Sequence, residues 1–367
     1  MSLQSEIEAK ASTIFRDAYQ MSIGELLNLY KDKELDIHPE FQRVFRWSDY
    51  QKTKLIESIM LNIPIPSIFV SQDDRGVWDV IDGVQRLSTI FQFVGIFRDE
   101  KGVLSEPLKL QKTEYLPSFE GMKWEDKEDE NHSFTPEQRL FFKRSRIDIV
   151  IVKKESDPNT KYELFQRLNT GGTNLSDQEV RNCLMIMTNK EFYDFIMKLE
   201  SYENYRNCVP ISDRKTDEQY RVELVLRLLI AQAYDWKDIN NYEELAQLLD
   251  KQTIRLCEES IDYKDIESKF KRTFDIIWDA VGENGFKRYK DGKHSGGFMT
   301  SAYQGIASGV FVNIEQIEAV PKRIEWLGEK IIEFYLSDKF QELTTPGTKA
   351  IPRYRELFKF GTEFFRP

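Results

Sequence analysis

The sequence predicts an α+β fold, in which an N-terminal α/β module with a small mixed sheet precedes a mostly α-helical module. Two observations support this prediction. Short strand-like runs alternate with helical patterns in the first half, whereas from about residue 191 the apolar spacing is almost entirely helical. We place the boundary near residues 190 to 215. The chain then consists of an N-terminal helix over 1–20, an α/β module over 21–190 and a helical domain over 191–367.

Caps and prolines define the first helices of the α/β module. Ser22 is placed to cap a short helix, and Ser48 with Gln51 forms an S-x-x-Q capping box in front of an amphipathic run. Pro64 and Pro66 end that second helix, because proline lacks the N–H group that a helix interior needs.

Two strands follow, with the sequences SIFVSQ and VWDVI. The polar turn between them is short, so we expect them to pair as an antiparallel hairpin. Asp82-Gly83 ends the second strand, and a helix is expected from Gln85 to Phe97. A later strand is expected from Arg146 to Lys154.

Helical patterns dominate the rest of the chain. Ser176 and Glu179 form a second capping box, S-x-x-E, which opens a helix through Met187. Beyond it, the clearest helices are RVELVLRLLIAQAY and IEQIEAVPKRIEWLGEKIIEFYL, and strand signals nearly vanish.

The composition is that of a folded, acidic protein. The 367 residues include 52 Lys+Arg and 62 Asp+Glu, which gives a formal net charge of −10, and 40% are hydrophobic. At about 150 residues per domain this length suggests about two domains, and the apolar content excludes wholesale disorder. The acidic balance excludes coating of DNA or anionic lipid by the whole surface, but it permits a local basic cleft.

Neither the cysteines nor the apolar runs indicate a secreted or membrane protein. Cys183, Cys208 and Cys257 are too few and too far apart for a disulfide framework or a zinc site. The N-terminus lacks the pattern of a signal peptide, and runs such as Leu224 to Ala233 are far shorter than the ~20 residues that span a bilayer. We therefore expect a soluble, cytoplasmic protein without membrane contact.

The strongest functional signal lies where the second strand of the hairpin meets the following helix. Gly83 permits a tight turn there, and the N-terminus of a helix presents N–H groups and a positive dipole end that suit a phosphate. Arg86 adds a fork of donors, while Asp82 could hold Mg²⁺, cap the helix or do both, with Asp79 nearby. A capped helix with Arg86 in a salt bridge explains the same residues equally well.

A second signal is the segment HPEFQRVFRW, residues 38–47. Gln42, Arg43 and Arg46 place polar donors among aromatic side chains, and such an arrangement can stack a base and hold its phosphates. The alternative is that the aromatic residues belong to the core and the arginines form surface ion pairs.

A third signal is a glycine-containing loop after the later strand. Gly171 and Gly172 permit loop conformations that are closed to other residues. Asn169 offers a neutral donor, and Arg167 and Arg181 supply charge. Two helices joined by such a loop are also common as plain structure.

A fourth signal is a basic segment in the helical half, next to a flexible Ser-Gly-Gly. Its charged residues are Lys287, Arg288, Lys290, Lys293 and His294. In an acidic protein these side chains could contact a nucleic-acid backbone. A solvated basic turn is the alternative.

Several enzyme classes are excluded by the absence of their motifs. The sequence contains no G-x-x-x-x-G-K-[ST], H-E-x-x-H or G-x-S-x-G, and no kinase signature set. The three histidines are His38, His132 and His294, and no second histidine lies near any of them, so a histidine-metal nuclease is not indicated.

Four segments in order resemble the N-terminal domain of GmrSD-type restriction endonucleases, a family that also includes the N-terminal part of SspE. They are HPEFQRVFRW, IESIMLNIPIPSIFV, IDGVQRLST and FQRLNTGGTNLSDQEVRN. The resemblance covers roughly residues 20 to 190. The family is in turn similar to the ParB and sulfiredoxin fold, so the resemblance implies a ParB/sulfiredoxin-like N-terminal module.

The resemblance also implies a function. Pro39, Gln42 and Arg43 match a Pro-x-x-Gln-Arg-like box that binds a nucleotide, and IDGVQR carries the D-G-x-Q-R motif implicated in nucleotide binding and hydrolysis. The implied catalytic residues are Asp82, Gln85 and Arg86. The implied nucleotide contacts are Gly83, Arg43, Gln42, Ser88, Thr89, Arg167 and Asn169, with Mg²⁺ on Asp82 and Asp79. The nucleotide that the resemblance implies is GTP, ATP or CTP.

Relatives of this family act in defence against foreign or modified DNA. The resemblance therefore implies a nucleotide-hydrolysing sensor subunit of a bacterial restriction or antiviral system, with Arg46, Lys287, Arg288 and Lys293 as nucleic-acid contacts. Many relatives carry a C-terminal His-Asn-His-type nuclease domain whose histidines this chain lacks, so we expect a separate nuclease subunit or a protein that only senses and signals. A non-hydrolysing nucleotide- or DNA-binding switch, a metal-dependent nuclease that uses Asp79 and Asp82, and a homo-oligomer stay open as alternatives.

Overall fold

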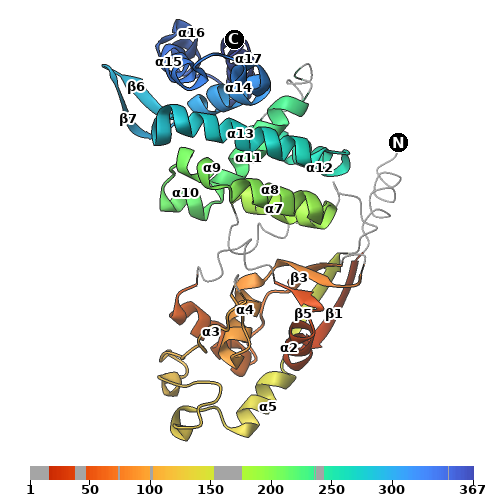
Figure 1. The fold of residues 1–367 in the computed structure, drawn as a ribbon. Helices are drawn as coiled ribbons and strands as arrows, with labels where there is room; N and C mark the ends of the chain where they lie inside the picture. Colours follow the sequence, from red (N-terminus) through yellow and green to blue (C-terminus); the bar gives the residue numbers. More distant parts are fainter. Residues whose placement is uncertain are drawn as a thin grey trace. The chain divides into compact units, whose positions relative to one another are not determined.

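The chain folds into two compact units, residues 1–172 and 173–367, in the computed structural model (Figure 1). The structure describes residues 16–37, 47–72, 75–99, 102–152, 176–234, 236, 244–345 and 347–367. The sequence analysis placed the division at 190 to 215. In the structure helix α7 (Asp177–Thr188) packs against helices α8, α11 and α12, so the division precedes it.

The first unit is built on a mixed, five-stranded sheet. Its strands are β1 (Arg16–Ser22), β2 (Leu35–Asp36), β3 (Ile68–Gln72), β4 (Trp78–Asp82) and β5 (Arg146–Val152), in the spatial order β1-β5-β3-β4-β2. Strand β3 is antiparallel to β4 and parallel to β5, and β2 is parallel to β4. The expected hairpin, the later strand and the α+β class are therefore confirmed.

Strand β1 corrects the last part of the expected N-terminal helix over 1–20, while residues 1–15 lie outside those that the structure describes. Residues from Arg16 onward form a strand that pairs antiparallel with β5 along its whole length. The alanine, glutamine and methionine in RDAYQMS fit a helix locally. Pairing with β5 outweighs this weak preference, because the ladder satisfies the backbone groups of both strands.

Four α-helices accompany this sheet in the described part of the unit. They are α2 (Ile23–Lys31), α3 (Asp49–Met60), α4 (Val84–Val94) and α5 (Pro136–Arg144). The predicted caps are confirmed: Ser22 accepts a hydrogen bond from the N–H of Glu25, and Ser48 with Gln51 forms a complete capping box. Helix α4 ends earlier than expected, because Gly95 adopts the left-handed conformation that closes it.

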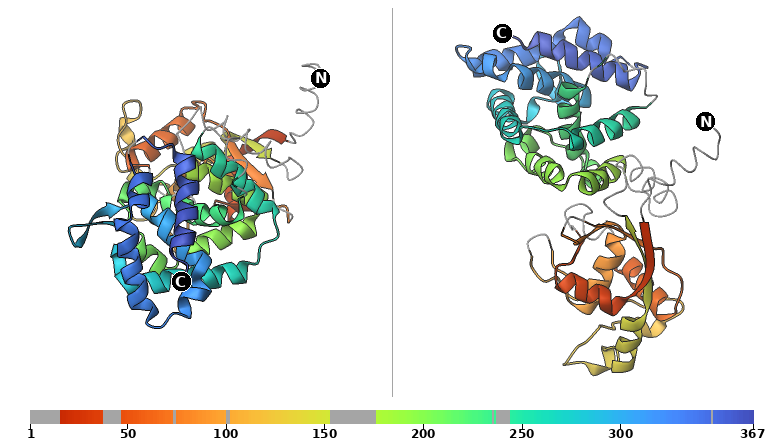
Figure 2. Two further views of the ribbon diagram at one scale, coloured as in Figure 1. Left: turned by 90° about the horizontal axis from the view of Figure 1, so that it is seen from above. Right: turned by 90° about the vertical axis from the view of Figure 1, so that its right-hand side faces the viewer.

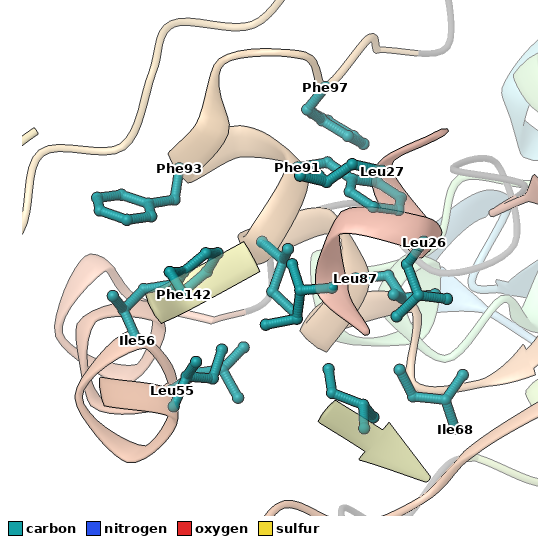
Figure 3. Close-up of a cluster of buried hydrophobic side chains, with 14 of the residues drawn as sticks. Leu26, Leu27, Leu55, Ile56, Ile68, Leu87, Phe91, Phe93, Phe97 and Phe142 are labelled. Atoms are coloured by element: carbon teal, nitrogen blue, oxygen red, sulfur yellow. The ribbon is translucent and has the colours of Figure 1, made fainter. Parts of the chain in front are cut away.

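The hydrophobic core of this unit fixes the position of α4. Its labelled members in Figure 3 come from four helices, a strand and the segment after α4: Leu26, Leu27, Leu55, Ile56, Ile68, Leu87, Phe91, Phe93, Phe97 and Phe142. Phe93 of α4 makes edge-to-face contacts with Trp124, Phe134 and Phe142 at ring-centroid distances of 5.0–5.6 Å. Such pairs add to the burial energy, so the C-terminal end of α4 is packed firmly against the core.

In its described residues the second unit is helical apart from one hairpin (Figures 1 and 2). Beyond α7 its helices are α8 (Lys190–Glu200), α9 (Glu203–Cys208), α10 (Asp213–Asp217), α11 (Tyr220–Ala233), α12 (Leu245–Glu258), α13 (Tyr263–Val281), α14 (Thr300–Glu318), α15 (Arg323–Leu336), α16 (Asp338–Leu343) and α17 (Ala350–Phe364). The capping box of Ser176 and Glu179 at the start of α7 is confirmed. Helices α14 and α17 cross at glycines Gly305, Gly309 and Gly361.

The hairpin is a correction, because almost no strand was expected in this half. It consists of β6 (Lys287–Lys290) and β7 (Lys293–Phe298). Asp291 and Gly292 form its turn with positive φ angles of 53° and 79°. Asp-Gly suits a two-residue turn in which both residues are left-handed, and this local signal was overlooked.

The three cysteines form no disulfide in the structure. Cys183, Cys208 and Cys257 are all free and buried. Burial raises the pKa of the Cys208 thiol to about 12, so this cysteine is no reactive thiolate. Among the described residues, no helix combines the length and the apolar character that crossing a membrane requires.

Candidate functional site

The turn between β4 and α4 depends on Gly83. Its φ angle is +102°, and a Cβ atom at this position would lie 2.9 Å from Cγ1 of Ile68. Both the conformation and the space therefore require glycine. Helices α2, α3 and α5 are each capped by a hydroxyl side chain, whereas α4, alone among the described α-helices of this unit, has no side-chain cap and no acidic residue in its first turn.

Arg86 lies in the first turn of α4, and its side chain links the Gly83 turn to the segment before β3. Its Nη1 donates to the carbonyl oxygens of Pro66 at 2.5 Å and Ser67 at 3.2 Å, and its Nη2 donates to Oδ2 of Asp82 at 2.7 Å. The side chain is only 11% exposed. This is the salt-bridge alternative that the sequence left open, so Arg86 is first a positioning residue. Of its five N–H donors, two have no partner among the described residues.

A β-bulge brings Asp79 and Asp82 to one face of the sheet. Cross-strand partners share a face, and Ser71 pairs with Asp79 while Phe69 pairs with Asp82. Because Phe69 and Ser71 are two residues apart on β3, all four side chains lie on the same face, which strict alternation along β4 would not allow. The bulge was not predictable from the sequence.

The two aspartates differ in environment. Asp79 is 6% exposed, whereas the side chain of Asp82 is 36% exposed. The described residues contain no group of three or more His, Cys, Asp or Glu side chains that could hold a metal ion. A Mg²⁺ site on Asp82 and Asp79 therefore stays a prediction, and it would have to draw its other ligands from water or from the nucleotide.

Two further predicted contacts point inward. Ser88 and Thr89 are completely buried within α4, and the Thr89 hydroxyl donates to the carbonyl oxygen of Gln85 at 2.7 Å. Neither side chain lines an open surface. Gln85, by contrast, is half-buried in the first turn, beside Gly83 and Arg86.

A comparison with family models finds a match that covers most of this unit and the start of the next. The model described as GmrSD restriction endonuclease, N-terminal domain, matches residues 23–186. Over these residues the chain is similar to a GmrSD N-terminal domain. The resemblance drawn from the four motifs is therefore confirmed. Comparisons with curated proteins and with solved structures find no match, so a ParB/sulfiredoxin-like fold stays a prediction.

Five predicted contacts of the matched region lie outside the residues that the structure describes. They are Gln42, Arg43, Arg46, Arg167 and Asn169. These residues stay predictions. Gly83, Asp82, Gln85 and Arg86 are therefore the predicted residues that the structure brings together at one place.

Arg181, from the last motif of the domain, has a structural role. Its side chain is 1% exposed, and it donates to carboxylate oxygens of Asp250 and Glu223, both at 2.9 Å. The charge that the sequence analysis offered to a ligand is therefore satisfied within the second unit, where it links α7, α11 and α12.

A cavity that the sequence did not suggest lies at the opposite end of α4. It has a volume of about 570 Å³, and its lining includes Lys31, Lys33 and Arg98 next to Gly95. Helix α4 has 11 residues, which corresponds to roughly 16 Å at 1.5 Å per residue. The cavity is therefore separate from the Gly83 turn, and no motif in the sequence marked its three cations as a group.

The predicted nucleic-acid contacts Lys287, Arg288 and Lys293 all lie on the β6–β7 hairpin. Lys287 forms an ion pair with Glu283 at 2.8 Å. For Arg288 and Lys293 the described residues provide no carboxylate within ion-pair distance. These two cations are therefore available to a partner, and Lys287 is not.

Proposed function

We propose that this chain is a component of a bacterial restriction or antiviral defence system that acts on DNA, and that it binds a nucleoside triphosphate at the turn between β4 and α4. The observation that carries this proposal is the glycine turn of Gly83, without a side-chain cap, inside a region that is similar to a GmrSD restriction endonuclease N-terminal domain. An uncapped helix start next to a glycine offers backbone N–H groups to phosphate oxygens.

The charges around the turn support an anionic ligand. The ion pair between Arg86 and Asp82 neutralises the nearest carboxylate, and two N–H groups of Arg86 have no described partner. Gln85 adds a neutral side chain in the same turn. A triphosphate there would meet donors rather than an unpaired negative charge.

Hydrolysis is the reaction that we assign to this site. Water attacks the γ-phosphorus, the bond to the bridging oxygen breaks, and the products are a nucleoside diphosphate and inorganic phosphate. Gln85 would orient the water or a phosphate, and Asp82 would accept a hydrogen bond from that water or hold Mg²⁺. Bound Mg²⁺ would supply charge neutralisation on the phosphates. Phosphoryl transfer needs mainly positioning and charge stabilisation, so such a small set of residues can suffice.

Binding without turnover is a second candidate. It is favoured by the engagement of Asp82 with Arg86 at 2.7 Å, which leaves that carboxylate less able to act on water. In this case the nucleotide would switch a partner subunit, such as a separate nuclease.

Release of phosphate from GTP, ATP and CTP, with Mg²⁺ and with or without DNA, tests the proposal. We expect the wild type to hydrolyse one of them and Asp82→Asn to be slower by about 10²-fold, because an oriented water is lost. The control is Asp148→Asn, which changes an exposed carboxylate on β5 of the same sheet and should leave the rate unchanged. Binding without release would favour the switch, and wild-type protein that neither binds nor hydrolyses a nucleotide would contradict both candidates.

A further inference from the structure

The two faces of the β6–β7 hairpin have different chemistry. Cross-strand partners are Arg288 with Ser295 and Lys290 with Lys293, so these four side chains lie on one face. The other face carries Lys287, Tyr289, His294 and Phe298. That second face packs inward, since the ring of His294 lies 5.8 Å from the ring of Tyr335 in α15. The first face is therefore the outer one, and it is basic.

The basic face is open to a partner. The hairpin extends beyond the helices around it in Figures 1 and 2. Arg288, Lys290 and Lys293 are exposed, and the described residues provide none of them with an ion-pair partner. A cavity of about 800 Å³ lies beside Arg288 and Lys290, and residues of α15 and α16 line its other side.

Two lysines of like charge lie opposite each other on this face, and this arrangement favours an anionic partner. Lys290 and Lys293 are direct cross-strand partners next to the turn. Like charges directly opposite each other destabilise a hairpin, and although Asp291 lies in the turn between them, neither lysine forms an ion pair with a described carboxylate. A phosphate bound between the two ammonium groups would attract both of them and so offset their mutual repulsion.

Gly297 is an independent sign of a close approach. Its neighbour Gly296 has a φ of +84° and needs to be glycine, but Gly297 has no positive φ, and a Cβ atom there would meet nothing within 4 Å. The fold itself therefore does not require glycine at position 297. Glycine in a strand often marks a place where another backbone comes close, and here it lies in the segment that follows Ser295.

We infer that this face binds the sugar-phosphate backbone of duplex DNA. The face consists of Arg288, Lys290 and Lys293 and of the backbone at Gly297, which carries no side chain. The inference rests on the proposed function, which supplies DNA as the partner. The cations would neutralise phosphates, and the absence of a side chain at position 297 would let the strand lie close. Contacts of this kind position DNA without reading its sequence, so recognition of a particular base or modification is assigned to other parts of the system.

Fluorescence anisotropy of the full chain with a labelled duplex of about 30 base pairs, over about 50 to 200 mM salt, tests the inference. The variant is Arg288→Gln/Lys290→Gln/Lys293→Gln. We expect its affinity at low salt to fall roughly tenfold or more, and the slope of log affinity against log salt to become shallower by about 2–3, at ~0.9 per lost phosphate contact. Gly297→Val should also weaken binding without changing the melting temperature.

The matched control removes three lysines that already have carboxylate partners. Lys190→Gln/Lys322→Gln/Lys339→Gln changes the net charge by the same amount, and these lysines pair with Asp194, Glu325 and Glu342. Its affinity and salt slope should stay close to those of the wild type. If both triple variants bind DNA as the wild type does, the inference is wrong while the proposed function stands. If the wild type does not bind DNA at all, both fail.

Discussion

Replacing Arg181 with methionine is expected to lower the free energy of unfolding by about 3–5 kcal/mol, because it removes a buried cation that hydrogen-bonds to two buried carboxylates. The guanidinium is 1% exposed and contacts Glu223 and Asp250, whose side chains are only 11% and 7% exposed. Arg227 still pairs with Glu223 at 2.5 Å, but this second cation does not replace the first. Denaturant unfolding followed by circular dichroism measures the difference.

The pH dependence gives this prediction a second readout. Burial alone would raise the pKa of Glu223, but the charges of Arg227 and Arg181 outweigh burial and hold it below its ordinary value of 4.5. A carboxyl with a lowered pKa stabilises the fold above its unfolded pKa, and this contribution is lost as the pH falls through the folded pKa. The gap between wild type and variant should therefore shrink below pH 4.5.

Arg214→Met is the control for Arg181. It removes an arginine that is 88% exposed and paired with Glu218 at 2.9 Å. A surface pair of this kind contributes little, so the change should stay within about 0.5 kcal/mol. Equal losses in the two variants would show that the buried network does not hold α7, α11 and α12 together.

Gly361→Ala is expected to lower the free energy of unfolding by about 3 kcal/mol, at the upper end of the usual cost of overpacking. Gly361 lies in α17, where a Cβ atom would overlap the carbonyl oxygen and the Cα atom of Gly305 in α14. These obstacles are backbone atoms rather than the ends of flexible side chains. The two helices would therefore have to move apart along their crossing.

Gly328→Ala provides a control of opposite sign. Gly328 also lies inside a helix, α15, but a Cβ atom there would be 3.5 Å from the carbonyl oxygen of Ala280, an ordinary contact. Alanine is the better helix former, so this variant should gain about 0.5–1 kcal/mol. Thermal unfolding of the pair compares them directly, and a loss of similar size in both would contradict the close crossing of α14 and α17.

Local signals in the sequence were sufficient where local chemistry determines the structure. The capping boxes at Ser48 and Ser176, the hairpin of β3 and β4, and the turn at Gly83 were all predicted from residues that lie next to each other. The strand β1 was not, because its conformation depends on β5, more than a hundred residues away.

The sequence predicted which residues make up the candidate site, but it did not predict how their side chains are arranged. The sequence pointed to Asp82, Gly83, Gln85 and Arg86 as one group. It could not show that Arg86 donates one hydrogen bond to Asp82 and two to the carbonyl oxygens of Pro66 and Ser67. These two residues precede β3 and are distant from Arg86 in the sequence. Nor could it show the bulge that brings Asp79 to the face of Asp82, since strand register is set by pairing between strands.

The most direct test of the account is the equilibrium binding of a nucleoside triphosphate to Gln85→Glu, measured by titration calorimetry. A glutamate in the first turn suits the helix dipole, and thermal unfolding of the variant shows whether the fold is retained. The same charge would repel a triphosphate at the Gly83 turn. Gln72→Glu, at the far end of β3, adds an identical charge to the unit and serves as the control. The account predicts one nucleotide per chain for the wild type and for Gln72→Glu, and none for Gln85→Glu; undiminished binding by Gln85→Glu would contradict it.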